Sequence, residues 1–222
     1  MSRKHHVLVV LPQRDTSCFL ADIPNSVPLS SLMLPGRSWP FFFHWIFSDP
    51  DIGTHETMAF YGWPISQCQY RPLDVQLHAG IRVVDIRLSI IDGRLIAYHG
   101  IFPEVTPFAD MLVTLHGFLT SPITASEMVV VSIKQEDSDT KLFPRLVLEE
   151  IVMSPGGLQM WFLENRIPCL GEVRGKAVMF SRFGGDCWEK GANGIHPPIW
   201  PDSAKEGFEW ECEGTLIRTQ DW

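Results

Sequence analysis

Short apolar segments alternate along this chain with longer segments in which apolar residues recur at helical spacing. The clearest strand is predicted for residues 81–88, which are rich in β-branched side chains and follow a glycine. Asp92-Gly93 then predicts a tight turn into a second short strand at residues 95–98. Further strands are predicted at 29–34, 128–133, 177–180 and 215–218, and helices at 65–79, 108–119 and 141–152.

This alternation predicts an α/β fold with a parallel sheet or a (β/α) barrel. Polar residues fall at the C-terminal ends of the predicted strands, where barrel enzymes carry their catalytic groups. A closed eight-stranded barrel typically needs about 250 residues, whereas this chain has 222. We therefore expect an incomplete TIM-type barrel, with about six strands present.

The composition is that of a folded protein, with 45% apolar and 20% charged residues. A net charge of −8 argues against a general nucleic-acid binder. The five cysteines include no C-x-x-C pair, which removes the usual zinc-site spacing, and their odd number favours a reducing compartment. The apolar run 7–11 is too short for a secretory signal. The compartment stays open, with a cytoplasmic or peripheral-membrane location favoured over secretion.

Two histidines and an arginine could together cleave a phosphodiester. His55 lies in Gly53-Thr54-His55-Glu56, His99 lies in Tyr98-His99-Gly100, and Arg87 ends the strand segment Asp85-Ile86-Arg87. An imidazole transfers protons in both directions near neutral pH, and a guanidinium matches the oxygens of a phosphate. This set predicts general acid–base catalysis with a phosphate clamp.

Residues 28–222 resemble the catalytic X-domain of phosphatidylinositol-specific phospholipases C, of the metal-independent kind found in bacteria and fungi. Residues 1–27 would then be an irregular lead-in. The resemblance rests on short patterns in the family's order. They are Gly53-Thr54-His55-Glu56, Gly80-Ile81-Arg82-Val83-Val84-Asp85-Ile86-Arg87, Tyr98-His99-Gly100, Val131-Ser132-Ile133-Lys134-Gln135-Glu136, Arg174-Gly175-Lys176, Ser181-Arg182-Phe183 and Gln220-Asp221-Trp222.

The resemblance implies a role for each residue of the predicted site. His55 would take the proton from the inositol 2-hydroxyl, and His99 would protonate the departing diacylglycerol oxygen. Arg87 would hold the phosphate, and Asp85 would orient Arg87 or the acid. Glu56 stands where many relatives carry an aspartate beside the first histidine.

The resemblance also implies which groups bind the substrate. Lys134, Arg182 and Asp221 match family positions that contact the inositol ring or the phosphate. Arg87 stands where a calcium-dependent relative would need a metal ligand, so we expect no metal and no other cofactor. The expected partner is a phosphoinositide-type lipid at a membrane surface, bound by a monomer.

Less specific interpretations of the same residues remain. Asp85 and Arg87 could form an ordinary ion pair inside a barrel, and residues 134–136 could be a solvated strand end. His78, His116 and His196 match no motif and are interpreted as structural or solvated.

The family pattern is interrupted twice. Pro35-Gly36 is separated from Thr54-His55 by an aromatic-rich insertion at residues 37–52. A retained intron or gene-model error would explain the split motif, and a true loop whose aromatic rings touch a bilayer is the alternative. Relatives also continue beyond Trp222, so we expect the C-terminal barrel strands to be missing, together with the late aspartate that pairs with the first histidine.

The leading hypothesis is a phosphodiesterase that releases diacylglycerol and a cyclic inositol phosphate from phosphatidylinositol-type lipids. One alternative is a related enzyme acting on glycerophosphodiesters or sphingomyelin, although those sites usually hold a metal between carboxylates. Another is an inactive lipid-binding or truncated remnant of the same family.

Overall fold

The computed structural model describes residues 15–38, 72–99, 102–136, 142–183, 193–201 and 206–219, with only the backbone given for 37–38, 99 and 102–105. Its strands are β1 (Gly36–Ser38), β2 (Val83–Ile91), β3 (Arg94–His99), β4 (Phe102–Pro107), β5 (Val129–Gln135), β6 (Trp161–Phe162), β7 (Ala177–Ser181), β8 (Phe208–Cys212) and β9 (Thr215–Thr219). Its helices are α2 (Leu73–His78), α3 (Phe108–Thr120), α4 (Phe143–Met153) and α5 (Leu170–Val173), with short 3₁₀ turns η1 (Thr16–Cys18), η2 (Leu29–Ser31) and η3 (Gly157–Met160).

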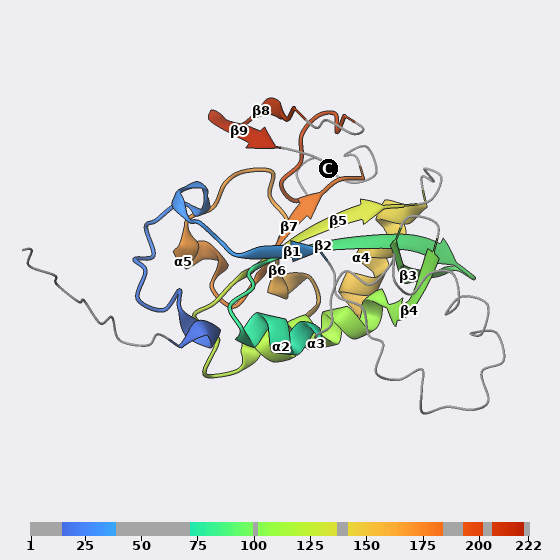
Figure 1. Cartoon of the computed structure of the whole chain (residues 1–222), viewed down its shortest axis with the longest axis horizontal. Helices are drawn as coiled ribbons and strands as arrows, with labels where there is room; N and C mark the ends of the chain where they lie inside the picture. Colours follow the sequence, from blue (N-terminus) through green and yellow to red (C-terminus); the bar gives the residue numbers. More distant parts are fainter. Residues whose placement is uncertain are drawn as a thin grey trace, which may run out of the picture.

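The described strands form one seven-stranded sheet and a separate hairpin. The main sheet has the order β4-β3-β2-β5-β7-β6, with β1 added beside β2. Strands β1, β2, β5, β6 and β7 run parallel, whereas β3 and β4 are antiparallel additions at one end. The helices α2, α3 and α4 cover one face, and the β8–β9 hairpin lies over the other (Figure 1).

The two faces of the sheet follow from the alternation of side chains along each strand. Val84, Ile86 and Leu88 of β2 belong to the apolar cluster that packs against α3 and α4. The intervening residues Asp85 and Arg87 are only partly buried and point to the opposite, inner face, because successive strand residues alternate between faces. Each strand therefore contributes one row to a helix-covered core and one row to the inner face.

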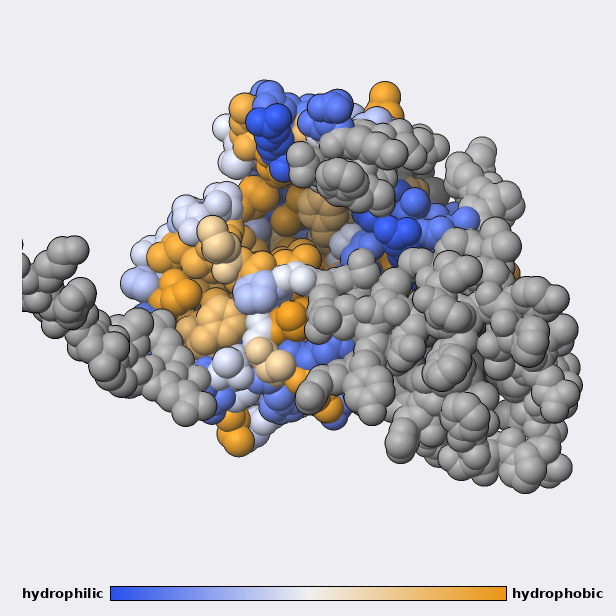
Figure 2. Space-filling model, in the orientation of Figure 1, coloured by the Kyte–Doolittle hydropathy of each residue, from blue (hydrophilic) through white to orange (hydrophobic). Residues whose placement is uncertain are grey.

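A second apolar cluster fills the inner face nearer the N-terminal ends of the strands. Val178 of β7 packs there with Trp210 of β8, Leu20 of the N-terminal segment and Ile195. Figure 2 shows hydrophobic residues in the hollow below the β8–β9 hairpin and a hydrophilic patch over the C-terminal halves of β2 and β5. Among the described residues, the polar side chains of β2 and β5 on the inner face therefore lie toward the C-terminal ends of these strands.

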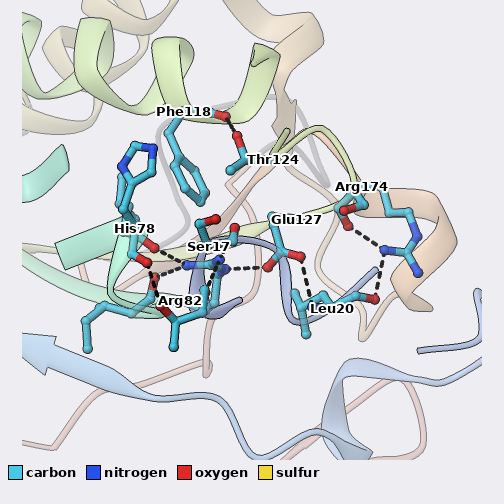
Figure 3. Close-up of polar contacts among 12 residues, drawn as sticks. Ser17, Leu20, His78, Arg82, Phe118, Thr124, Glu127 and Arg174 are labelled. Carbon is cyan, nitrogen blue, oxygen red and sulfur yellow. Dashed lines mark hydrogen bonds and ion pairs between the residues drawn. The ribbon is translucent and has the colours of Figure 1, made fainter. Parts of the chain in front are cut away.

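Two arginines, the buried Arg82 and the partly buried Arg174, attach the described part of the predicted lead-in to the sheet. Arg82, just before β2, forms an ion pair with Glu127 at 2.7 Å, and both side chains are fully buried. Arg82 also donates to the carbonyl of Ser17 at 2.9 Å, and Glu127 accepts from the backbone N–H of Leu20 at 2.8 Å (Figure 3). Arg174 donates to the carbonyl of Ile23 at 2.6 Å. Ser17, Leu20 and Ile23 of the lead-in are therefore held by buried and partly buried hydrogen bonds.

The predicted strand at 29–34 is wrong. Residues 29–31 form the 3₁₀ turn η2, and the first strand begins only at Gly36. Prolines at positions 28 and 35 flank the apolar run and cannot donate to a ladder. Leu29, Leu32 and Leu34 pack onto the inner apolar cluster instead, so burial rather than strand pairing explains the run.

The remaining predicted elements are found, with some bounds displaced. The helix predicted at 65–79 appears as α2 at its C-terminal end, and residues 65–71 lie outside the described residues. The strand bearing Arg87 does not end there but continues to Ile91 and turns back at Asp92-Gly93, both with positive φ. Strands β4, β6 and β8 were not predicted.

Candidate functional site

The site lies where β2, β5 and β7 carry polar side chains on the inner face. The parallel ladder between β2 and β5 pairs Asp85 with Ser132 and Arg87 with Lys134. The next ladder pairs Ser132 with Phe180, two residues before Arg182. Because paired residues on neighbouring strands project to the same face, the register brings these side chains together.

Asp85 is the centre of this cluster. Its Oδ1 accepts a hydrogen bond from the Ser132 hydroxyl at 2.8 Å and from the Arg182 guanidinium at 3.2 Å. Its Oδ2 accepts from Nε of Arg87 at 3.1 Å. The carboxylate thus accepts hydrogen bonds from Arg87 on β2, from Ser132 on β5 and from Arg182 directly after β7. These bonds fix the orientation of all three side chains.

Arg87 is held from two sides and remains partly open to solvent. Besides its bond to Asp85, it donates from Nη1 to Oε1 of Glu136 at 3.0 Å. Burial lowers the pKa of Arg87, but the two neighbouring carboxylates outweigh burial and leave that pKa above its ordinary value. Its side chain is 24% exposed, so a permanent positive charge is fixed in place and still accessible.

Lys134 adds a second accessible cation. Its ammonium nitrogen lies 3.8 Å from Oε1 of Glu136, and its side chain is 27% exposed. Glu136 itself is 10% exposed, so residues 134–136 are not the solvated strand end that was one interpretation of this segment. The three cations of the cluster outnumber its two carboxylates by one, which favours an anionic ligand in a chain of net negative charge.

Arg182 follows directly after β7 and is the most buried cation of the cluster. Its side chain is 6% exposed, and its guanidinium lies over the ring of Trp200 with 4.4 Å between the guanidinium carbon and the ring centroid. Sequence reasoning proposed Arg182 as a substrate contact. The structure places it against Asp85, whose Oδ1 accepts a hydrogen bond from the Arg182 guanidinium.

The two proposed catalytic histidines are not brought together within the described residues. His55 and Glu56 lie outside those residues, as does Asp221. For His99 only the backbone is described: it ends β3 and pairs with Phe102 of β4. Since Leu88 pairs with Ala97 in an antiparallel ladder, the residues after Ala97 run back along β2 toward Arg87.

Three members of the cluster were missed as site residues from the sequence. Ser132 and Glu136 alternate with Lys134 along β5, so period-two spacing on a strand ending in polar residues was a usable signal. Trp200 carried no comparable local signal. The histidines outside the motifs have ordinary contacts: Nδ1 of His78 pairs with the Asp74 carbonyl at 2.8 Å, and Nδ1 of His196 with the Gly194 carbonyl at 2.9 Å.

Neither a metal cluster nor a membrane span was found in the searched part of the chain. Across the described ranges, no three histidine, cysteine, aspartate or glutamate side chains are placed to hold a metal ion. No helix in those ranges combines the length and apolar character needed to cross a bilayer.

Comparison with known proteins identifies relatives in sequence and in structure. No protein-family model matches the chain. A 1-phosphatidylinositol phosphodiesterase of Listeria monocytogenes is 27% identical over 217 residues, which cover 91% of this chain and 57% of the relative. The chain therefore spans little more than half the length of this curated relative.

Solved structures show the same relationship at the level of the fold. A phosphatidylinositol-specific phospholipase C of Staphylococcus aureus superimposes with a TM-score of 0.69 at 22% identity, covering 93% of this chain and 66% of that one. The enzyme of the same name from Listeria monocytogenes gives 0.58 at 25% identity, over 76% of this chain and 57% of that one. The expected TIM-type barrel fold is confirmed, and the described strands form an incomplete barrel. In sequence and fold the chain is similar to bacterial phosphatidylinositol-specific phospholipases C.

Proposed function

We propose that this chain cleaves the glycerol–phosphate bond of phosphatidylinositol-type lipids by metal-independent acid–base catalysis. The observation that carries the proposal is the guanidinium of Arg87, held by Asp85 at 3.1 Å and Glu136 at 3.0 Å yet partly open at the inner face. A fixed planar cation of this kind fits two phosphate oxygens at once. The names of the relatives supply the substrate class.

The proposed reaction uses an oxygen of the substrate as the nucleophile. His55 takes the proton from the inositol 2-hydroxyl, and the resulting oxygen attacks the adjacent phosphorus. As the phosphorus–glycerol oxygen bond breaks, His99 gives its proton to the departing diacylglycerol oxygen. The products are diacylglycerol and a cyclic inositol phosphate, with Glu56 beside the base where many relatives carry an aspartate.

Arg87 supplies the positive charge that this transition state requires. Negative charge on the non-bridging phosphate oxygens grows as the pentavalent transition state forms. A cation already held in position stabilises this charge, and so lowers the activation barrier, without any rearrangement of the site. Calcium-dependent phosphodiesterases place a metal at this point, and a guanidinium there would repel a divalent cation. We therefore propose that the reaction needs no metal, and that Lys134, Arg182 and Asp221 serve to bind or orient the head group.

The proposed role of His99 as the acid rests on the Tyr98-His99-Gly100 family pattern, and the structure describes the backbone of this residue at the end of β3. The antiparallel register of β2 and β3 directs the end of β3 back toward Arg87. Asp85, which already binds Arg87, stands on the strand beside that end. The lipid would be reached at a membrane surface, and the name of the Staphylococcus aureus structure, which refers to membrane binding, supports this part of the proposal. We further propose that the chain acts as a monomer.

The decisive test is release of radiolabelled cyclic inositol phosphate from phosphatidylinositol vesicles in the presence of EDTA. We expect turnover with EDTA and its loss in both His55→Ala and His99→Ala. Turnover that appears only on adding calcium would refute the metal-free proposal. Full activity of either histidine variant would refute the assignment of that residue.

The two alternative functions give distinct results in the same assay. An inactive relative would bind phosphatidylinositol vesicles without releasing product from the wild-type chain. A related phosphodiesterase would leave phosphatidylinositol intact and cleave glycerophosphodiesters or sphingomyelin, which can be included as parallel substrates.

A further inference from the structure

Trp200 is a site-adjacent residue that the reaction just described does not use. Its ring forms a platform under the guanidinium of Arg182, with 4.4 Å from the guanidinium carbon to the ring centroid. A cation placed over an indole face is attracted by the ring's quadrupole, and the attraction is stronger where water is excluded. Arg182 meets that condition, because its side chain is 6% exposed.

The segment that carries Trp200 is held close to β7 by its backbone. The N–H of Ser181 donates to the carbonyl of Ile195 at 2.9 Å, and the N–H of Ile195 donates to the carbonyl of Met179 at 2.9 Å. Gly194 permits this approach, since a Cβ built there would lie 2.4 Å from the Met179 carbonyl oxygen. The start of the segment that carries Trp200 is therefore attached to β7, the strand directly before Arg182.

Two further rings restrain the indole. Phe180 of β7 meets Trp200 edge to face at 5.9 Å between centroids, and Phe208 of β8 does so at 5.1 Å. Edge-to-face pairs at these separations are favourable beyond the area that they bury. The platform under Arg182 is thus restrained both by the main sheet and by the β8–β9 hairpin.

We propose that Trp200 is a positioning residue for Arg87, acting through Arg182 and Asp85, and this inference rests on the proposed function. Arg182 and Ser132 both occupy Oδ1 of Asp85, at 3.2 and 2.8 Å, which leaves Oδ2 directed at Nε of Arg87. Removing the indole ring leaves the Arg182 guanidinium without its aromatic platform. Oδ1 of Asp85 then loses one of its two hydrogen-bond donors, and the orientation of the carboxylate is less well fixed. The hydrogen bond from Arg87 to Asp85 is then weakened, although two side chains, Arg182 and Asp85, separate Arg87 from the substituted residue.

A purely structural role for Trp200 makes a different prediction. Loss of aromatic packing would lower the free energy of unfolding and leave the hydrogen bonds of Arg87 unchanged in the molecules that remain folded. The two roles are separated by a measurement on the Arg87 side chain itself, made well below the unfolding temperature.

The measurement is the exchange of the Arg87 Nε–H with water, followed by ¹⁵N-resolved NMR and assigned from the signal that disappears in Arg87→Lys. In Trp200→Leu we expect this exchange to accelerate by about tenfold, the effect of weakening one hydrogen bond to a charged group. Trp200→Phe keeps an aromatic face and should restore most of the protection. Trp161→Leu removes a buried tryptophan of the helix-side core and serves as the stability control.

Kinetics on phosphatidylinositol micelles provide the second readout. We expect kcat of Trp200→Leu to fall by about tenfold or more, because small displacements of a catalytic group are costly. Unchanged Arg87 exchange in Trp200→Leu, or equal acceleration in Trp161→Leu, overturns the positioning role. Because the exchange measurement needs no substrate, a wild-type chain that fails to cleave phosphatidylinositol refutes the proposed function alone.

Discussion

Arg87 donates from Nε to Oδ2 of Asp85 at 3.1 Å, from a position two residues further along the same strand. Residues at this spacing share a face of a strand, so the pair is formed within β2 itself. The second oxygen of Asp85 is occupied by groups from β5 and the end of β7. The ion pair that spacing alone suggested is therefore one part of a network spanning three parallel strands.

Replacement of Arg87 by lysine should lower kcat for phosphatidylinositol by about a hundredfold, in the range found when one preorganised transition-state contact is lost. Lysine keeps the charge but cannot donate to Asp85, Glu136 and a phosphate in one plane. Arg145→Lys on the exposed surface of α4, where Arg145 is 73% exposed, is the matched control and should behave as wild type. Equal activity of the two variants would contradict the clamp.

The buried pair Arg82–Glu127 should be essential for stability. Arg82→Met leaves the Glu127 carboxylate uncompensated at full burial, and we expect the free energy of unfolding to fall by about 3–5 kcal/mol in urea titrations. The double variant Arg82→Met/Glu127→Leu removes both charges and should recover part of that loss. Exposed ion pairs contribute less than about 1 kcal/mol. If Arg82→Met lowers the free energy of unfolding by no more than that, burial does not increase the contribution of this pair to stability.

Glu150 on α4 should make stability depend on pH. Its Oε1 accepts from the backbone N–H of Leu95 at 3.2 Å. Burial raises the pKa of this carboxyl, and the bond from Leu95 and the charge of Arg94 oppose the rise only in part. Because the folded pKa exceeds the unfolded one, ionisation of Glu150 costs folding free energy as the pH rises through the folded pKa.

The test compares Glu150→Gln with wild type in urea titrations from acid to neutral pH. The variant should gain stability relative to wild type as the pH rises, and the gain should vanish below about pH 4, where the carboxyl is protonated in both states. A stability difference that is the same at every pH would exclude a raised pKa as its cause.

Gly194→Ala should destabilise the fold and disturb the site. An added Cβ would lie 2.4 Å from both Cβ and the carbonyl oxygen of Met179, at a φ of +72°. Overpacking against backbone and left-handed strain each cost about 1–3 kcal/mol, so a total of about 2–6 kcal/mol is expected from thermal unfolding. Gly93→Ala, at φ +75° with no atom within 4 Å, isolates the backbone strain and should cost about 1 kcal/mol.

The local elements were the most predictable part of the fold. The strand at 81–88, the Asp92-Gly93 turn and the helix beginning at Phe108 were all confirmed, because period-two and helical spacing are visible within a few residues. Strand β4 was missed since prolines at 103 and 107 argue against a strand, yet an edge position tolerates them. Strand β8 has the sequence FEWEC, in which apolar and acidic residues alternate, and Trp210 and Cys212 are buried. This period-two pattern is a strand signal that the sequence does contain.

The candidate site was predicted in part for the same reason. Asp85, Arg87 and Lys134 stand out on single strands, and their placement on one inner face follows from local alternation. Their contacts depend on the register between strands. A shift of one residue between β2 and β5 would move Ser132 and Lys134 to the helix-covered face.

The sequence alone thus determined the central strands and the main helices, the polar row along β2 and β5, and the family patterns, all of which are encoded by neighbouring residues. The tertiary structure decided that Asp85 meets Ser132, Arg182 and Arg87, and that Trp200 lies beneath Arg182. Register, strand order and the path of residues 193–201 are set by long-range burial and backbone pairing. No stretch of neighbouring residues contains that information, which is why the network around Arg87 became visible only in the folded chain.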